Sequence, residues 1–141
     1  MNLSRYPIDT PETPQTQCLI QDCRSELSKN GMCVLPEFIS ATTLARMQQE
    51  ARSLSPDAHH NEHWRTSPRA GGDSPLGEST KATRASIWAI AYDQMSSDSP
   101  SRQLYESDYL LKFVSAITDE PELYRCVDPL VSCHFSVFRD G

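Results

Sequence analysis

The 141-residue sequence predicts a single domain of α+β fold. Three segments place apolar residues three and four positions apart, a spacing that brings them onto one face of a helix. Residues 131–138 instead alternate apolar and polar side chains, which is the period of a strand with one exposed face. A chain of this length buries roughly 68–70% of its unfolded surface on folding, so one hydrophobic core is the most that it encloses.

Residues 1–17 are predicted to form an extended arm over the surface of the domain. Pro7, Pro11 and Pro14 interrupt any regular helix or strand in this segment. Residues 18–141 make up the domain itself, and no internal repeat is visible in the sequence. We therefore expect one folded body that carries one N-terminal arm.

The three predicted helices have recognisable start or stop signals. The first runs from Thr16 to a stop at Gly31, because glycine readily adopts the left-handed conformation that ends a helix. Ser40 caps the second helix and Pro56 closes it, whereas Asp108 begins the third. The expected apolar stripes are Leu19, Ile20, Cys23 and Leu27 in the first helix, Leu44, Met47, Ala51 and Leu54 in the second, and Leu110, Phe113, Val114 and Ile117 in the third.

Two further strands and one long loop are expected between the helices. Residues 32–35 are apolar and bounded by glycine and proline, which predicts a short buried strand. Residues 87–92 are rich in aromatic and β-branched side chains, as strands are. Residues 55–84 hold most of the turn-forming prolines and glycines, so a long loop is predicted there, either a functional lid or a disordered segment.

Composition excludes several classes of function. The net charge is −6 and no basic run is present, so nucleic-acid binding is not expected. No apolar stretch approaches the ~20 residues that span a bilayer, and the N-terminus lacks the pattern of a signal peptide, which predicts a cytoplasmic protein. The five cysteines lack zinc-knuckle spacing and predict free thiols rather than a disulfide framework.

One dense group of potential metal ligands occurs at residues 59–63. On a helix His59 and His63 would share a face, and with Glu62 they would make a zinc site, which is one alternative. The order His-His-Asn-Glu-His differs from the zincin pattern, in which the glutamate directly follows the first histidine. An exposed polar loop is the simpler interpretation of this group.

The C-terminal strand carries the candidate ligand face. His134 and Ser136 lie on one polar face of it together with Ser132. This face either meets solvent or lines the interior of a barrel that holds a polar ligand. Asp140-Gly141 then signals a tight hairpin turn that no second strand follows, so the chain is expected to be a fragment.

Two stretches of the sequence resemble a known enzyme family. Residues 27–54 are similar to the opening of iron(II)/2-oxoglutarate-dependent oxygenases, and read LSKNGMCVLPEFISATTLARMQQEARSL. Residues 104–141 resemble a bacterial branch related to phytanoyl-coenzyme-A dioxygenase-like and amino-acid-halogenase-like enzymes, and read LYESDYLLKFVSAITDEPELYRCVDPLVSCHFSVFRDG. The resemblance covers most of residues 18–141.

The resemblance implies the N-terminal helices and first strands of a double-stranded β-helix, a jelly-roll or cupin-like barrel that is incomplete in this chain. Family members use iron(II), held by a His-x-Asp or His-x-Gly motif and a distal histidine, and 2-oxoglutarate, anchored by an arginine. No histidine of this chain has Asp or Gly two positions later, so the resemblance implies ligands beyond Gly141 and no tight metal binding here. Of the cofactor-facing positions it carries over Ser136, with His134 as its neighbour.

These observations lead to the hypothesis that the chain is the N-terminal fragment of a hydroxylase or halogenase that acts on a small molecule. The fragment would be inactive by itself, because the metal ligands are missing. Its unpaired strand edges would favour self-association. The alternative is a self-contained α+β binding or interaction module without catalytic activity.

Overall fold

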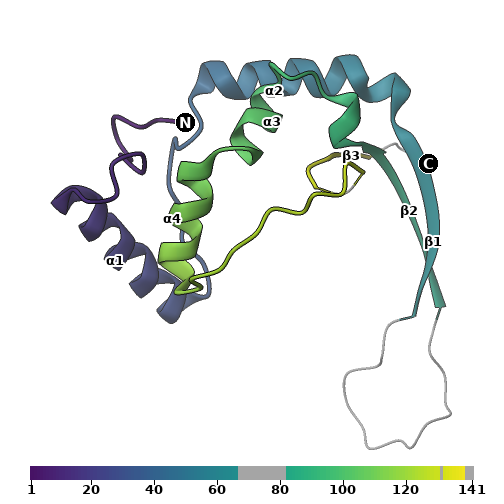
Figure 1. The fold of residues 1–141 in the computed structure, drawn as a ribbon. Coiled ribbons are helices and arrows are strands. Elements are labelled where there is room, and N and C mark those ends of the chain that lie inside the picture. The colour runs from purple at the N-terminus through teal and green to yellow at the C-terminus, as the bar shows by residue number, and fades with distance from the viewer. Residues whose placement is uncertain (67–81, 131, 139–141) are drawn as a thin grey trace, which may run out of the picture.

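The computed structural model describes residues 1–66, 82–130 and 132–138. Helices make one end of the molecule and an antiparallel sheet makes the other, with α2 running between them along one side (Figure 1). The predicted α+β class is therefore confirmed. The elements are α1 (Pro14–Asn30), α2 (Ala41–Leu54), the 3-10 helix η1 (Ser55–Asp57), β1 (His59–Thr66), β2 (Ala82–Ile90), the 3-10 helix η2 (Tyr92–Gln94), α3 (Pro100–Tyr105), α4 (Asp108–Thr118) and β3 (Phe135–Val137).

Capping residues fix both ends of α1. Thr13 Oγ1 accepts a hydrogen bond from the Thr16 backbone N–H at 3.3 Å, and Pro14 occupies the first turn, where no N–H is needed. At the other end Gly31 has a φ of 70°, and its N–H donates to the Leu27 carbonyl at 2.9 Å. The helix thus stops at the predicted glycine, but it starts two residues earlier than predicted.

The N-terminal segment is part of the hydrophobic core. Tyr6 and Ile8 are 7% and 3% exposed, and they pack in one cluster with Ile20 and Cys23 of α1 and Phe113 of α4. The prediction of an extended arm over residues 1–17 therefore needs correction. The segment folds back on itself in a series of turns, which proline favours, and its last four residues belong to α1.

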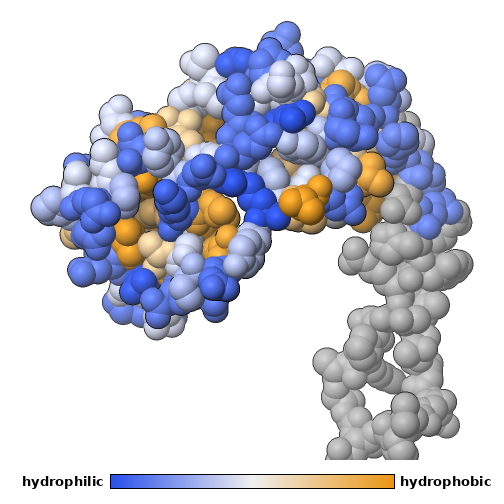
Figure 2. Space-filling model, viewed as in Figure 1, coloured by the Kyte–Doolittle hydropathy of each residue, from blue (hydrophilic) through white to orange (hydrophobic). Residues whose placement is uncertain are grey.

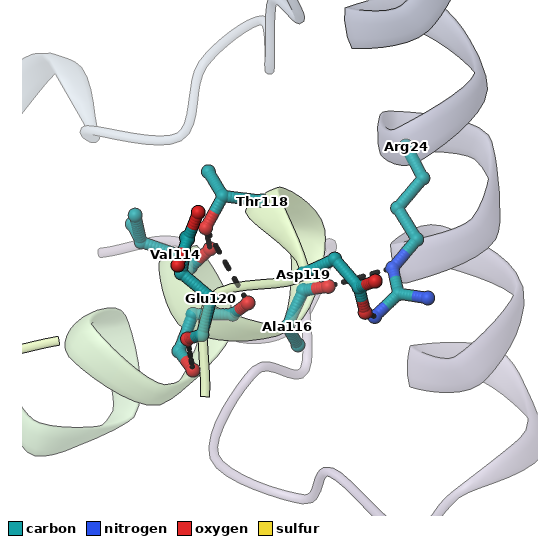
Figure 3. A network of polar contacts seen from close by, with 7 residues as sticks. Arg24, Val114, Ala116, Thr118, Asp119 and Glu120 are labelled. Carbon is teal, nitrogen blue, oxygen red and sulfur yellow. Dashed lines mark hydrogen bonds and ion pairs between the residues drawn. The ribbon is translucent and has the colours of Figure 1, made fainter. Parts of the chain in front are cut away.

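Polar contacts join the end of α4 to α1 (Figure 3). Arg24 Nε donates to the Ala116 carbonyl at 2.7 Å, and Arg24 Nη2 donates to Asp119 Oδ1 at 2.9 Å. Asp119 ends α4 in the left-handed conformation, with a φ of 59°. The helix begins at Asp108, as predicted, and the two helices lie side by side around the buried cluster.

The second helix lies closer to the surface than its sequence predicts. Ser40 caps it as expected, because Ser40 Oγ accepts from the Thr43 N–H at 3.2 Å. None of its residues is fully buried, and Leu44 of the predicted apolar stripe is 47% exposed. A polar contact holds α2 near α3 instead, since the buried Ser99 hydroxyl donates to the Glu50 carboxylate at 2.8 Å.

The described residues form a three-stranded antiparallel sheet in the order β1-β2-β3. β1 pairs with β2 along its whole length, from His59 opposite Ala89 to Thr66 opposite Ala82. β3 pairs with the last residues of β2, where Ala89 stands opposite Ser136. Within the described part of the chain β2 is therefore the central strand, and β1 and β3 are the two edges.

The loop predicted over residues 55–84 is only partly a loop. Residues 59–66 are strand β1, and β2 already begins at Ala82. Residues 67–81 lie outside the described residues. The loop prediction rested on turn formers, which are concentrated in residues 67–81, whereas β1 is held by its pairing with β2.

Two strand predictions also change. Residues 32–35 form no strand, although their burial alternates, with Met32 and Val34 exposed and Cys33 and Leu35 half-buried. An extended segment without a hydrogen-bonded neighbour is not a strand, and this one lies against the helical core. β3 is shorter than the predicted 131–138, and the hairpin predicted at the end of the chain lies outside the described residues.

Several large apolar side chains remain at the surface of the described part of the molecule (Figure 2). Val127 is 94% exposed and Phe138 is 95% exposed. These side chains leave apolar surface in contact with solvent. The most exposed members are Met32, Val34, Tyr124, Val127, Leu130 and Phe138.

Candidate ligand-binding face of the sheet

The two residues predicted to face a cofactor lie at the free edge of the sheet. His134 immediately precedes β3 and Ser136 lies within it, and both are exposed. Phe135 and Val137 alternate with them and are half-buried. The structure therefore gives β3 the one polar and one packed face that the alternating sequence predicts.

Strand pairing adds a third residue to the polar face of β3. Ala89 of β2 stands opposite both Ser136 of β3 and His59 of β1, so these three residues form one row across the sheet. Residues paired in this way point to the same face, and two strand spacings separate the outer members by roughly 10 Å. His59 is exposed, as Ser136 is. The face thus offers an imidazole and a hydroxyl across a small central alanine.

The opposite face of the sheet carries a more closely packed group. His60 Nε2 lies 2.8 Å from Ser86 Oγ and 3.6 Å from Glu62 Oε1. The His60 ring stacks on Trp88, with ring centroids 4.4 Å apart and an interplanar angle of 19°. This group was not predicted, because Ser86 and Trp88 meet His60 and Glu62 only through the register of β1 and β2.

The zinc alternative assumed that residues 59–63 form a helix, but they belong to strand β1. The proposed site needed His59 and His63 one helical turn apart, whereas both belong to strand β1. Successive side chains of a strand point to opposite faces, so His59 and Glu62 lie on different faces. Sequence adjacency therefore does not bring this group of ligands together.

The described residues do not fit an iron site. They contain no group of three or more His, Cys, Asp or Glu side chains placed to hold a metal ion. His134 and Ser136 supply one imidazole and one hydroxyl, whereas a facial iron site needs two histidines and a carboxylate or their equivalent. What this face can do is donate and accept hydrogen bonds, for example with the carboxylate of a small acid.

The best-defined electrostatic network lies away from the sheet face, between η2 and α3. The Tyr92 hydroxyl donates to the Glu106 carboxylate, which raises the pKa of Tyr92 and lowers the pKa of Glu106. Arg102 Nε donates to the same carboxylate at 3.0 Å, and its guanidinium lies 4.3 Å from the centre of the Tyr92 ring. These groups satisfy one another, so we interpret the network as structural.

An apolar pocket lies between α4 and the segment that leads to β3. Its volume is about 350 Å³, and Ser132 is the residue of the predicted polar face that reaches it. Ser132 Oγ is buried and has no hydrogen-bond partner among the described residues. Ser132 therefore points away from the exposed environment that His134 and Ser136 share. The lining residues are Tyr105, Leu110, Leu111, Val114, Tyr124, Arg125, Cys126 and Ser132.

No protein-family model, curated protein or solved structure matches this chain. Within the residues that the structure describes, no helix is both long and apolar enough to cross a membrane.

Proposed function

We propose that this chain is the N-terminal part of an iron(II)/2-oxoglutarate-dependent oxygenase, a cytoplasmic hydroxylase or halogenase of a small molecule. Its strands would be the first of a double-stranded β-helix, and α1, α2 and α4 would cover the barrel. The order of the elements supports this proposal: two capped helices come first, then the antiparallel pair β1-β2, two further helices and the strand β3. The two resembling stretches, residues 27–54 and 104–141, contain α2, α4 and β3 in full.

The observation that carries the proposal is that the outer edge of β3 pairs with no other strand among the described residues. Among the described residues β3 pairs only with β2, so one edge is free to accept a further strand. Ser136 and His134 are exposed beside this edge, and Phe138 just after β3 is 95% exposed. Free edges and exposed aromatic side chains are features that folded proteins normally cover.

Within this proposal the described residues bind and position, and other residues hold the metal. The Ser136 hydroxyl would donate a hydrogen bond to a carboxylate of 2-oxoglutarate, with His134 as its neighbour on β3. Iron(II) would supply the oxidising chemistry once bound, through ligands that the described residues do not contain. The 141-residue chain by itself is therefore proposed to be inactive.

The first test is the reading frame that follows the Gly141 codon. We expect it to encode a His-x-Asp or His-x-Gly motif within a few residues, followed by a distal histidine and an arginine. A sequence with no such motif in any frame would overturn the proposal.

The second test compares the 141-residue chain with the chain extended through that motif. Both are incubated with iron(II), ascorbate and 2-oxoglutarate, and succinate release is measured against a metal-free control. The extended chain should form succinate and the short chain should not. Succinate from the short chain would show that its metal ligands lie within residues 1–141, and no succinate from a folded extended chain would contradict the proposed activity.

One observation favours a second candidate, a self-contained binding module without catalytic activity. The N-terminal segment, α1 and α4 enclose a cluster of buried residues without help from the sheet. Such a module would give the 141-residue chain a cooperative thermal transition and a monomeric mass in solution. The oxygenase proposal instead predicts self-association through the free edge of β3, which sedimentation analysis distinguishes from a monomer.

A further inference from the structure

Two of the five cysteines meet in the helical core. Cys23 lies on α1 and is 2% exposed, and Cys33 is half-buried and packs against the same cluster. Cys33 is also near enough to Cys23 to contribute to the raised pKa of the Cys23 thiol. They are ten residues apart in the chain, and the turn at Gly31 brings the second back beside the first.

The remaining cysteines have different surroundings. Cys18 and Cys126 are exposed, and Cys133 is half-buried at the other end of the molecule, near β3. None of these three belongs to the buried cluster or packs against it. Among the described residues, Cys23 and Cys33 are therefore the two cysteines that the fold brings into one packed cluster.

We propose that Cys23 and Cys33 are a modification site, at which a small disulfide such as oxidised glutathione converts the two thiols into an intramolecular disulfide. Cys33 is the more accessible sulfur and reacts first. Its thiolate attacks one glutathione sulfur, the disulfide of the reagent breaks, and one glutathione leaves as a thiolate that takes up the proton lost by Cys33.

The second step closes the bridge. The Cys23 thiol loses its proton and attacks the Cys33 sulfur, and the second glutathione leaves and takes up that proton. The two cysteine sulfurs are oxidised by two electrons in total, and one oxidised glutathione is reduced to two glutathione molecules. No other reactant is needed.

The surroundings of Cys23 make this second step the slow one. Burial is the main reason that the pKa of Cys23 is raised to about 12, and the contact with Cys33 and the carboxylates of Asp22 and Glu26 raise it further. The thiolate is the attacking species, so little of it is present at neutral pH. A mixed disulfide at Cys33 is therefore expected before the internal bridge forms.

The bridge would fasten a segment that the secondary structure leaves loose. Residues 32–35 belong to no helix and no strand, and Met32 and Val34 are exposed. A covalent bond from Cys33 to α1 would fix the connection between α1 and α2. It would stabilise the fold mainly by restricting the unfolded chain.

The experiment treats the folded 141-residue chain with oxidised glutathione and follows intact mass and free thiols over time. We expect the Cys23 and Cys33 thiols to be lost as one internal bridge, and peptide mapping counts any glutathionyl groups on the exposed Cys18 and Cys126 separately. A transient adduct of one glutathionyl group should come first, and peptide mapping should then find Cys23 linked to Cys33. The midpoint of thermal unfolding should be higher for the bridged protein than for the reduced protein.

Two variants separate this site from general thiol reactivity. Cys23→Ser should stop the reaction at a glutathionyl adduct on Cys33, and the matched double variant C18S/C126S should form the bridge as the natural chain does. Circular dichroism shows whether each variant is folded. Persistent adducts on Cys33 with Cys23 still free in the natural chain, or bridges that join Cys18 or Cys126 instead, would overturn the proposal.

Discussion

Phe113 is the residue whose replacement tests most directly where the stability of this fold lies. Its side chain is 5% exposed, and it packs from α4 against α1 and the N-terminal segment. An aromatic side chain buries roughly 150–250 Å², which at about 25 cal/mol per Å² gives about 4–6 kcal/mol as an upper bound. Phe113→Ala is therefore expected to lower the free energy of unfolding by about 3–5 kcal/mol.

Urea unfolding followed by circular dichroism measures this loss, and Tyr109→Ala is the matched control. Tyr109 is an aromatic residue one turn earlier on α4, and it is 49% exposed. Its replacement should cost less than about 1 kcal/mol, as at most surface sites. Equal losses for the two variants would refute the view that α4 packs on α1 through Phe113, and would indicate a different orientation of α4.

Three further predictions concern the sheet face, the buried thiol and the contact between the helices. In the extended, succinate-forming chain, Ser136→Leu should raise the concentration of 2-oxoglutarate needed for half-maximal rate. Ser86→Leu, on the opposite face of the sheet, should leave that concentration unchanged. Equal effects of the two variants would contradict the assignment of faces. The pKa of Cys23 is about 9 in the unfolded chain and is raised to about 12 in the folded protein. Cys23 therefore contributes stability that is complete below pH 9 and is lost as the pH rises toward 12. Urea unfolding between pH 8 and 11 should show that the free energy of unfolding falls less steeply with pH for Cys23→Ala than for the natural chain. Arg24→Ala should lower the free energy of unfolding by no more than about 1 kcal/mol, because its partner Asp119 is largely exposed; a loss as large as that of Phe113→Ala in the same assay would contradict this estimate.

The helices could be predicted because their signals are local. Ser40 and Gly31 act within one turn of the helix end that they define, through a side-chain oxygen and a left-handed backbone. In the predicted stripe of α1, Ile20 and Cys23 are buried and Leu19 and Leu27 are half-buried. The sequence of a helix does not indicate how much surface other elements offer for its apolar stripe to pack against. Leu44 follows the same helical spacing in α2 and is nevertheless half exposed.

The strands were harder to predict because their signals are not local. β1 reads His-His-Asn-Glu-His-Trp-Arg-Thr, a polar sequence without clear alternation, and it is a strand because each residue pairs with one of β2. Residues 32–35 show the reverse case, an apolar segment that pairs with no strand among the described residues. Sequence pattern indicates which residues suit a strand, and pairing decides which of them become one.

Some residues of the candidate site could likewise be predicted from local sequence, and others only from strand pairing. His134 and Ser136 could be found from alternation within one strand, and both are exposed as that pattern predicts. His59 joins their face only through the row across Ala89, which is set by the pairings of residue 59 with residue 89 and of residue 89 with residue 136. The contact of His60 with Ser86 has the same origin, so no reading of residues 59–63 alone could have found it.

The division of burial between the two ends of the molecule bears on how the sheet face could work. The helical end encloses its own core, whereas β1 has exposed histidines on both faces, with His59 on one and His60 on the other. Where its side chains are described, β1 is therefore held by its pairing with β2 and by the stack of His60 on Trp88. A strand held in this way gains most from any segment that covers the sheet, because covering strengthens the hydrogen bonds already present. Whatever binds beside Ser136 and His134 would thus order the sheet as well as occupy its face, so ligand binding and completion of the fold would be coupled.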